Sequence, residues 1–323
     1  MGWGAYYEIA FGSVFGYLLQ RAGLCTVAAM SHFVSGRGTG RLFGISTVVA
    51  WAAIPLLVYA VVVPAQSRLA ANPPLAWPMF AGAILLGVGS AVNGGCFVGS
   101  VARATAGDSN WLATFVGMAL ASSIVRSVST DTPVPFVVTR AVAPDQVSGL
   151  RAALLLVIAF GVGAVYFGWR RHRMRGVGAG RPRTLLHAAV GIAAALIFIR
   201  IPAWSYAAAL DDVVRRGPSA PWWGQHAVAI AMFGGSAVSA VVGSSFRWVA
   251  PQPALVARRL LGGGLMAFGA HWVPGGNDIL LLWAIPSLAI YGAVAYALMT
   301  GSIAVVIRIG AAASKRRLGP GNY

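Results

Sequence analysis

Two cysteines stand directly after short stretches that are expected to break a helix. Cys25 follows Gly23-Leu24, and Cys96 follows Gly94-Gly95, within otherwise apolar segments. A thiol is a weak S–H donor that stays neutral in apolar surroundings. It suits a soft, sulfur-bearing ligand better than a hard, strongly hydrated one. We therefore expect both thiols to contact a ligand. The alternative is that both cysteines are small residues that only fill space between helices.

A helix that restarts at Cys96 would also attract an anion. The backbone N–H groups of Cys96, Phe97 and Val98 would point freely into the break, at the positive end of the helix dipole. Arg21 would share a helical face with Cys25 if the first helix continues that far. Arg21 and Arg103 are each close in sequence to a cysteine, so both are candidates for drawing in an anion. Snorkelling to the membrane interface is their alternative role.

A second break near the C-terminus resembles the first. Residues 262–269 align with residues 82–89, and Gly275-Gly276-Asn277 then falls on Gly94-Gly95-Cys96. As N-cap and first-turn residues, Asn277 and Asp278 would satisfy the helix that follows. Alternatively, Asp278 takes up a proton or a cation, since an acid inside a membrane segment tends to mark an ion path. A weaker similarity relates residues 11–16 to residues 233–238.

Paired Gly/Pro interruptions in two halves of a membrane protein point to a transport site, because unwound backbone at membrane depth must be buried in protein or line a cavity. Glycines that merely let helices pack closely are the alternative. The predicted substrate path consists of Arg21, Cys25, Asn93, Gly94, Gly95, Cys96, Phe97, Arg103, Gly275, Gly276, Asn277 and Asp278.

Composition places the chain in a lipid bilayer. Of its 323 residues 58% are hydrophobic and only 10% charged, with a mean hydropathy of +0.75. The net charge of +17 reports membrane topology in so apolar a chain, so a nucleic-acid partner is not expected. The histidines show no metal-ligand spacing and no nucleotide motif is present, so we expect neither a metal nor a cofactor.

The fold class expected is an all-α polytopic membrane protein with two pseudo-symmetric, inverted halves whose broken helices meet at mid-membrane. The halves are residues 1–169 and 184–310. Between them lies a basic loop, 170–183, with six arginines and no acid, and a basic tail, 311–323, ends the chain. The positive-inside rule places this loop and tail in the cytoplasm and the N-terminus outside. About nine segments are expected to cross, at 5–30, 43–63, 79–102, 111–127, 149–169, 184–201, 224–243, 260–282 and 283–309.

Three stretches together resemble a known family. FGYLLQRAGLC (Phe15 to Cys25), LLGVGSAVNGGCFVGSVAR (Leu85 to Arg103) and GGGLMAFGAHWVPGG (Gly262 to Gly276) are similar to the YeeE/YedE family of bacterial inner-membrane proteins, the sulphur transport family. The resemblance implies uptake of thiosulfate or a related sulfur species along a narrow path lined by cysteines, which match Cys25 and Cys96. A third cysteine, typical after the second Gly-Gly, is replaced by Asn277.

The leading hypothesis is a permease or facilitator for a sulfur-containing anion, not an enzyme. A membrane sulfur carrier that holds a cysteine persulfide is one alternative. A transporter of another small solute, with Asn277 and Asp278 setting specificity, is the other. The lipid bilayer and the anion are the expected partners, and a cytoplasmic sulfur-handling protein is a further candidate.

Overall fold

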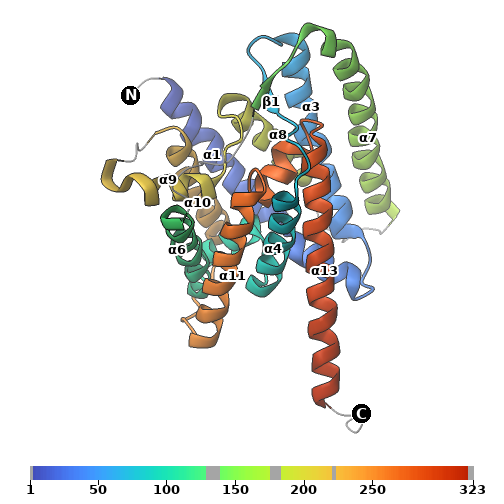
Figure 1. Ribbon diagram of the computed structural model, residues 1–323. Coiled ribbons are helices and arrows are strands. Elements are labelled where there is room, and N and C mark those ends of the chain that lie inside the picture. Colours follow the sequence, from blue (N-terminus) through green and yellow to red (C-terminus); the bar gives the residue numbers. More distant parts are fainter. Residues whose placement is uncertain (1–2, 129–138, 175–182, 220–222, 319–323) are drawn as a thin grey trace.

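A computed structural model describes residues 3–128, 139–174, 183–219 and 223–318, and these form an assembly of helices (Figure 1). The long helices are α1 (Trp3–Ala22), α3 (Gly40–Val62), α4 (Trp77–Asn93), α6 (Leu112–Val128), α7 (Val147–Met174), α8 (Arg183–Arg200), α10 (Gln225–Val242), α11 (Pro253–Trp272) and α13 (Ile290–Leu318). The short ones are α2 (Thr26–Val34), α5 (Phe97–Thr105), α9 (Tyr206–Arg216) and α12 (Asn277–Ile279), which continues as the π-helix η4 (Leu280–Ala284). Strands β1 (Arg68–Ala70) and β2 (Thr139–Ala141) pair antiparallel. The chain is therefore all-α in class, as the sequence predicted.

Six helical stretches among the described residues are long and apolar enough to cross a bilayer, which confirms a polytopic membrane protein. Helices α1, α6 and α11 were also expected to cross but fall outside this set, so the number nine stays a prediction. The six stretches are 40–62, 77–105, 147–170, 183–200, 225–242 and 290–313.

The expected helix breaks occur at glycines in the left-handed region. Gly23 has φ 61°, Gly94 has φ 77° and Gly275 has φ 98°. A β-carbon disfavours this conformation, so glycine lets the chain leave one helix and restart another in a single turn. Helices α2, α5 and α12 begin within a few residues of these glycines.

A fourth break was not predicted. The loop expected after residue 201 contains the 11-residue helix α9, which begins after Ala203 adopts a left-handed φ of 59°. Asp211 and Asp212 are only 4% exposed in this helix, and each pairs with an arginine four residues later, at 2.9 and 2.8 Å. The expectation that residues 202–223 form only a loop between two membrane segments was therefore wrong for residues 206–216, which are helical.

Other boundaries also differ from the expectation. The last segment does not begin at Trp283, which lies in η4; α13 begins at Ile290. Helix α7 continues to Met174, so residues 170–174 of the basic loop are helical, whereas 175–182 lie outside the described residues. Helix α13 likewise continues through the expected tail to Leu318.

Helices pack closely through glycine. Helices α1 and α10 run in the same direction, and a β-carbon on Gly16 would lie 1.9 Å from the carbonyl oxygen of Met232. Helices α3 and α8 are paired in the same way through Gly191. Helices α4 and α11 are antiparallel, so that Gly82 faces Gly269. These close approaches follow the small-residue packing typical of membrane helices.

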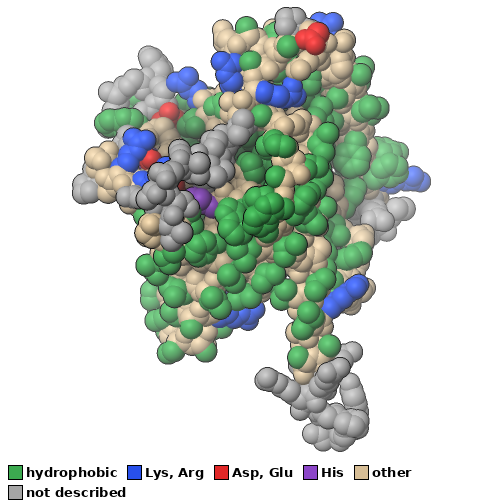
Figure 2. Space-filling view, viewed as in Figure 1, with side chains coloured by type: hydrophobic (Ala, Val, Ile, Leu, Met, Phe, Trp, Pro, Cys, Tyr) green, Lys and Arg blue, Asp and Glu red, His purple; other side chains and the backbone are tan. Residues whose placement is uncertain are grey.

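Apolar side chains cover much of the surface (Figure 2). Helix α7 is the most peripheral of the candidate spans, with 17% of its apolar window buried, and Leu155 and Leu156 on it are 68% and 73% exposed. Lys and Arg side chains gather mainly toward the upper and lower ends of the molecule in this view. An apolar girdle between charged ends is what a bilayer requires.

Candidate functional site

The two cysteines, remote in sequence, lie next to each other. Cys25 is the N-cap of α2 and Cys96 is the N-cap of α5, and their Sγ atoms are 3.9 Å apart. Both are free thiols, since a disulfide would require about 2.05 Å. A β-carbon on Gly99 would lie 2.8 Å from Cys25 Sγ, so glycine leaves room for this thiol.

The four helix breaks share one local design. In each, a residue with positive φ stands two positions before a polar or sulfur-bearing side chain. These side chains begin the short helices α2, α5, α9 and α12. They are two thiols, a hydroxyl and an amide: Cys25, Cys96, Ser205 and Asn277.

Hydrogen bonds connect three of these breaks across the centre of the protein. The Phe97 N–H donates to Asn277 Oδ1 at 3.1 Å, which joins α5 to α12. The Tyr206 hydroxyl donates to the Phe97 carbonyl at 3.0 Å. The Ser205 hydroxyl donates to Asp278 Oδ2 at 2.7 Å, which joins α9 to α12. All five residues are buried, so the breaks form one polar cluster.

Three of the expectations from the sequence are wrong. The Phe97 N–H was expected to point freely into the break, but Asn277 occupies it. Asn277 was expected to be the N-cap of its own helix, whereas Gly276 holds that position and the Asn277 side chain caps α5. Arg21 does not share a helix with Cys25, because α1 ends at Ala22; it is exposed and donates to the Tyr17 hydroxyl at 3.2 Å.

Two buried polar atoms of the cluster have no hydrogen-bond partner among the described residues: Asn277 Nδ2 and Asp278 Oδ1. A small cavity of about 10 Å³ is lined by Asp278, Tyr206 and apolar side chains. Such a space holds about one water molecule. Asn277 therefore offers an unused donor, and Asp278 offers an unused acceptor.

Asn93 holds the α4/α5 break in shape. Its Nδ2 donates to the Gly95 carbonyl and to Ser100 Oγ, both at 2.9 Å, and its Oδ1 accepts from Thr114 Oγ1 at 2.9 Å. Both polar atoms of its side chain are hydrogen-bonded, and the residue is fully buried. Gly95 packs on the ring of Trp111, where a β-carbon would clash at 2.6 Å. Asn93 and Gly95 thus position Cys96, and Gly94 beside them is exposed.

The remaining predicted residues surround this core. Gly275 and Gly276 are buried, and a β-carbon on Gly276 would lie 2.7 Å from Asp278 Oδ1 and 3.1 Å from the Phe97 ring. Arg103 is exposed in the last turn of α5, away from the thiols along that helix. Within the described residues, no group of three or more His, Cys, Asp and Glu side chains could hold a metal ion.

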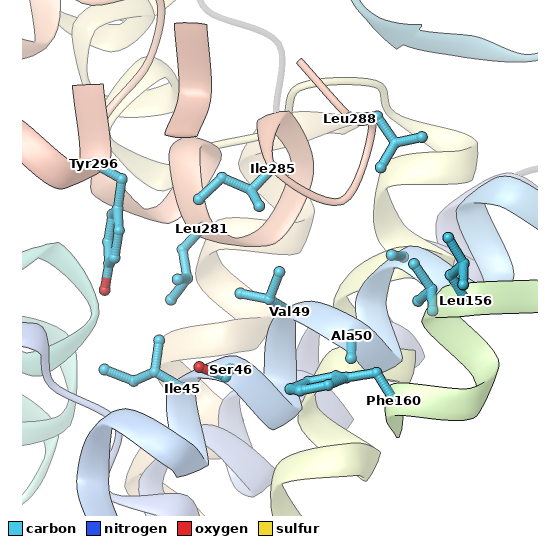
Figure 3. A pocket seen from close by; sticks show the side chains of 12 residues that line it. Ile45, Ser46, Val49, Ala50, Leu156, Phe160, Leu281, Ile285, Leu288 and Tyr296 are labelled. Carbon is cyan, nitrogen blue, oxygen red and sulfur yellow. The ribbon is translucent and has the colours of Figure 1, made fainter. Parts of the chain in front are cut away.

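A separate apolar pocket of about 450 Å³ lies between α3, α7, η4 and α13 (Figure 3). Ile45, Phe160 and Ile285 are among its lining residues. It adjoins the thiol region through Tyr296, whose hydroxyl is 3.1 Å from Thr26 Oγ1, next to Cys25. Its lining gives an anion little to bind.

Comparison with known protein families gives one matching family. A family described as Sulphur transport matches residues 21–210 and, in a second match, residues 180–305. Both cysteines and all four breaks fall within the matched residues. No curated protein matches the chain.

Proposed function

The chain belongs to the YeeE/YedE sulphur transport family, and from this premise we propose that it carries thiosulfate, or a closely related sulfur-containing anion, into the cell across the bacterial inner membrane. Membership of this family supports a sulfur-related transport role. The observation that carries the finer proposal is the pair of free thiols, Cys25 and Cys96, 3.9 Å apart where two helices begin.

Neutral thiols suit brief contact with a soft anion. Each S–H group donates weakly to the terminal sulfur of thiosulfate without adding a buried charge. The starts of α2 and α5 add the positive ends of two helix dipoles. Weak contacts at several adjacent sites let an ion enter and leave, which conduction requires.

Asn277, Asp278 and Ser205 offer nitrogen and oxygen groups, which suit the oxygen atoms of the anion better than its sulfur. The unused Asn277 Nδ2 is a donor suited to a sulfonate oxygen, and Ser205 already donates to Asp278. Asp278 Oδ1 is free to hold a proton when the anion passes. We therefore propose that the sulfane sulfur faces the cysteines while the oxygens face Asn277.

The helix contacts support an inverted repeat. If α1–α6 correspond to α8–α13, then α1 packing on α10 corresponds to α8 packing on α3, and α4 packing on α13 corresponds to α11 packing on α6. Antiparallel α4 and α11 correspond to each other. Under this pairing α1 matches α8, so the weaker similarity between residues 11–16 and 233–238 does not mark the repeat. Nine crossings, an external N-terminus and a cytoplasmic C-terminus follow from it and from the arginine-rich loops.

A membrane sulfur carrier is the second candidate, and the closeness of the two thiols favours it. A thiolate would attack the sulfane sulfur of thiosulfate, break its S–S bond, release sulfite and hold a persulfide. The second thiolate could then attack the inner sulfur of the persulfide and release hydrosulfide, leaving a disulfide. Mass spectrometry of the protein after exposure to thiosulfate separates the two functions, because transport leaves both cysteines unmodified.

The test of transport is uptake of radiolabelled thiosulfate by a transporter-deficient strain. Cys25→Ala and Cys96→Ala each remove the S–H donor and should each lower the initial rate by about ten-fold or more, since a hydrogen bond to a charged group is worth about 1.5–3 kcal/mol. The control is Ser46→Ala, because the Ser46 hydroxyl only donates to Leu42 O of its own helix, at 3.2 Å. Wild-type uptake by the double cysteine variant, at equal membrane expression, would contradict the proposal.

A further inference from the structure

Arg259, on α11, is held in an unusual setting next to the α4/α5 break. Its guanidinium carbon lies 3.8 Å from the centre of the Trp111 ring. On another side it meets Gly94, where a β-carbon would lie 2.8 Å from Arg259 Nη1. Nε and Nη1 are shielded from solvent and have no hydrogen-bond partner among the described residues. Buried N–H groups of a cation are expected to be satisfied, so this arrangement calls for an acceptor.

The charges around Arg259 do not supply one. Arg258 and Arg103 are its positively charged neighbours, and Asp108 is its negatively charged neighbour. The Asp108 carboxylate already accepts from Trp111 Nε1 at 3.0 Å, from Asn110 N at 3.1 Å and from Asn110 Nδ2 at 2.8 Å. Arg259 thus has two positively charged neighbours and one acid whose carboxylate is engaged elsewhere, and the excess positive charge favours an anion.

The position of Arg258 also favours an anion next to Arg259. Its side chain donates to the carbonyl groups of Val92 and Ala91 in the last turn of α4. A cation at this position offsets the negative end of the α4 dipole, which would otherwise repel an anion approaching the break. Arg258 and Gly94 are exposed, so the cluster lies at the edge of the protein, with the Arg259 Nε and Nη1 atoms just beneath its surface.

We propose that Arg259, Arg258 and Arg103 form a second anion site, at the cytoplasmic end of the path, which receives a divalent oxyanion as it leaves the thiols. The inference rests on the proposed direction and topology of transport. Gly94 lies two residues from Cys96, so the two sites are adjacent along the break. Because the arginine site recognises charge and oxygen atoms, it binds sulfate as well as thiosulfate, whereas the thiol pair requires a soft sulfur.

Sulfate binding to the purified full chain in phosphate-free maltoside micelles tests this site by isothermal titration calorimetry. Arg259→Gln should weaken sulfate binding about ten-fold or more, as expected for loss of a charge-assisted contact. Arg308→Gln, which removes an exposed arginine from α13, is the matched control and should leave the affinity unchanged. Arg259→Lys keeps the charge with fewer donors and should give an intermediate affinity, and thermal unfolding checks that each variant is folded.

The outcomes separate this site from the thiol site. The Cys25→Ala/Cys96→Ala double variant should keep sulfate binding, so failure of the transport proposal would leave this result intact. Equal sulfate affinity in Arg259→Gln and Arg308→Gln would overturn the inference. A lipid phosphate is the other source of such an anion. Displacement of sulfate by added phosphatidylglycerol, without displacement by thiosulfate, would identify a lipid headgroup site and would also overturn it.

Discussion

Gly99→Ala perturbs the thiol pair without touching either cysteine. The added β-carbon would lie 2.8 Å from Cys25 Sγ and 3.8 Å from Cys96 Sγ. Ordinary contacts between heavy atoms lie at about 3.5–4.0 Å, so the Cys25 thiol must move by about 0.7–1.2 Å. Cys25 Cβ is also only 3.3 Å from the new atom, so the simplest adjustment turns the thiol about its χ1 angle and away from its present position.

The cost in stability should be small. Replacing glycine by alanine within a helix gains about 1 kcal/mol, while overpacking costs about 1–3 kcal/mol. The variant should therefore lose between about 0 and 2 kcal/mol of unfolding free energy and remain folded. Transport should fall further, because loss of one S–H contact to an anion corresponds to about ten-fold or more in rate.

The assay is the initial rate of thiosulfate uptake at matched membrane expression. Gly301→Ala is the matched control, because a β-carbon at Gly301 meets nothing within 4 Å. Since the chain has only two cysteines, the rate at which an oxidant joins them can be followed by counting free thiols. Gly99→Ala should slow or prevent this bond. Uptake and oxidation rates equal to those of Gly301→Ala would refute the proposed role of thiol geometry.

The remaining predictions concern two hydrogen bonds of the polar cluster, Ser205 to Asp278 and Phe97 to Asn277. Ser205→Ala removes the donor to Asp278 Oδ2 and should cost about 1–3 kcal/mol, seen as a lower unfolding temperature in detergent. Asn277→Ala leaves the Phe97 N–H without its acceptor and should cost about 1 kcal/mol, the usual value of an N-cap. It should also reduce uptake. Unchanged unfolding temperatures in both alanine variants would mean that these hydrogen bonds do not hold the breaks together.

The sequence predicted the breaks that are marked by glycine. Gly94-Gly95 and Gly275-Gly276 interrupt apolar runs, and the cost of glycine in a helix makes such pairs conspicuous. The break before Ser205 was missed because its left-handed residue is Ala203 and no glycine is nearby. A signal was available. Ser205 precedes a short segment in which two acids stand four residues before two arginines, a pattern that favours an amphipathic helix with a serine N-cap.

Contacts between distant segments were harder to predict. Asn277 matches Cys96 in position, but the capping of α5 by its side chain depends on how α4 and α11 pack, which the local sequence does not specify. The placement of Arg21 was also wrong for a reason that helical spacing does not reveal. Arg21 and Cys25 would share a face of one continuous helix, but the turn at Gly23 ends α1 before Cys25. No pattern in the local sequence singles out Arg259 as a site residue. Its contact with Trp111 needs the tertiary structure.

Protection of the two thiols by substrate tests the central claim most directly. The full chain in proteoliposomes is treated with a thiol-specific reagent, and labelling of Cys25 and Cys96 is followed by mass spectrometry with thiosulfate, with sulfate, and without added anion. The account predicts that thiosulfate slows the labelling of both cysteines, that sulfate does so much less, and that neither thiol carries a persulfide afterwards. Labelling rates unaffected by thiosulfate would contradict a path along the cysteines, and a persulfide on either residue would favour the sulfur carrier instead.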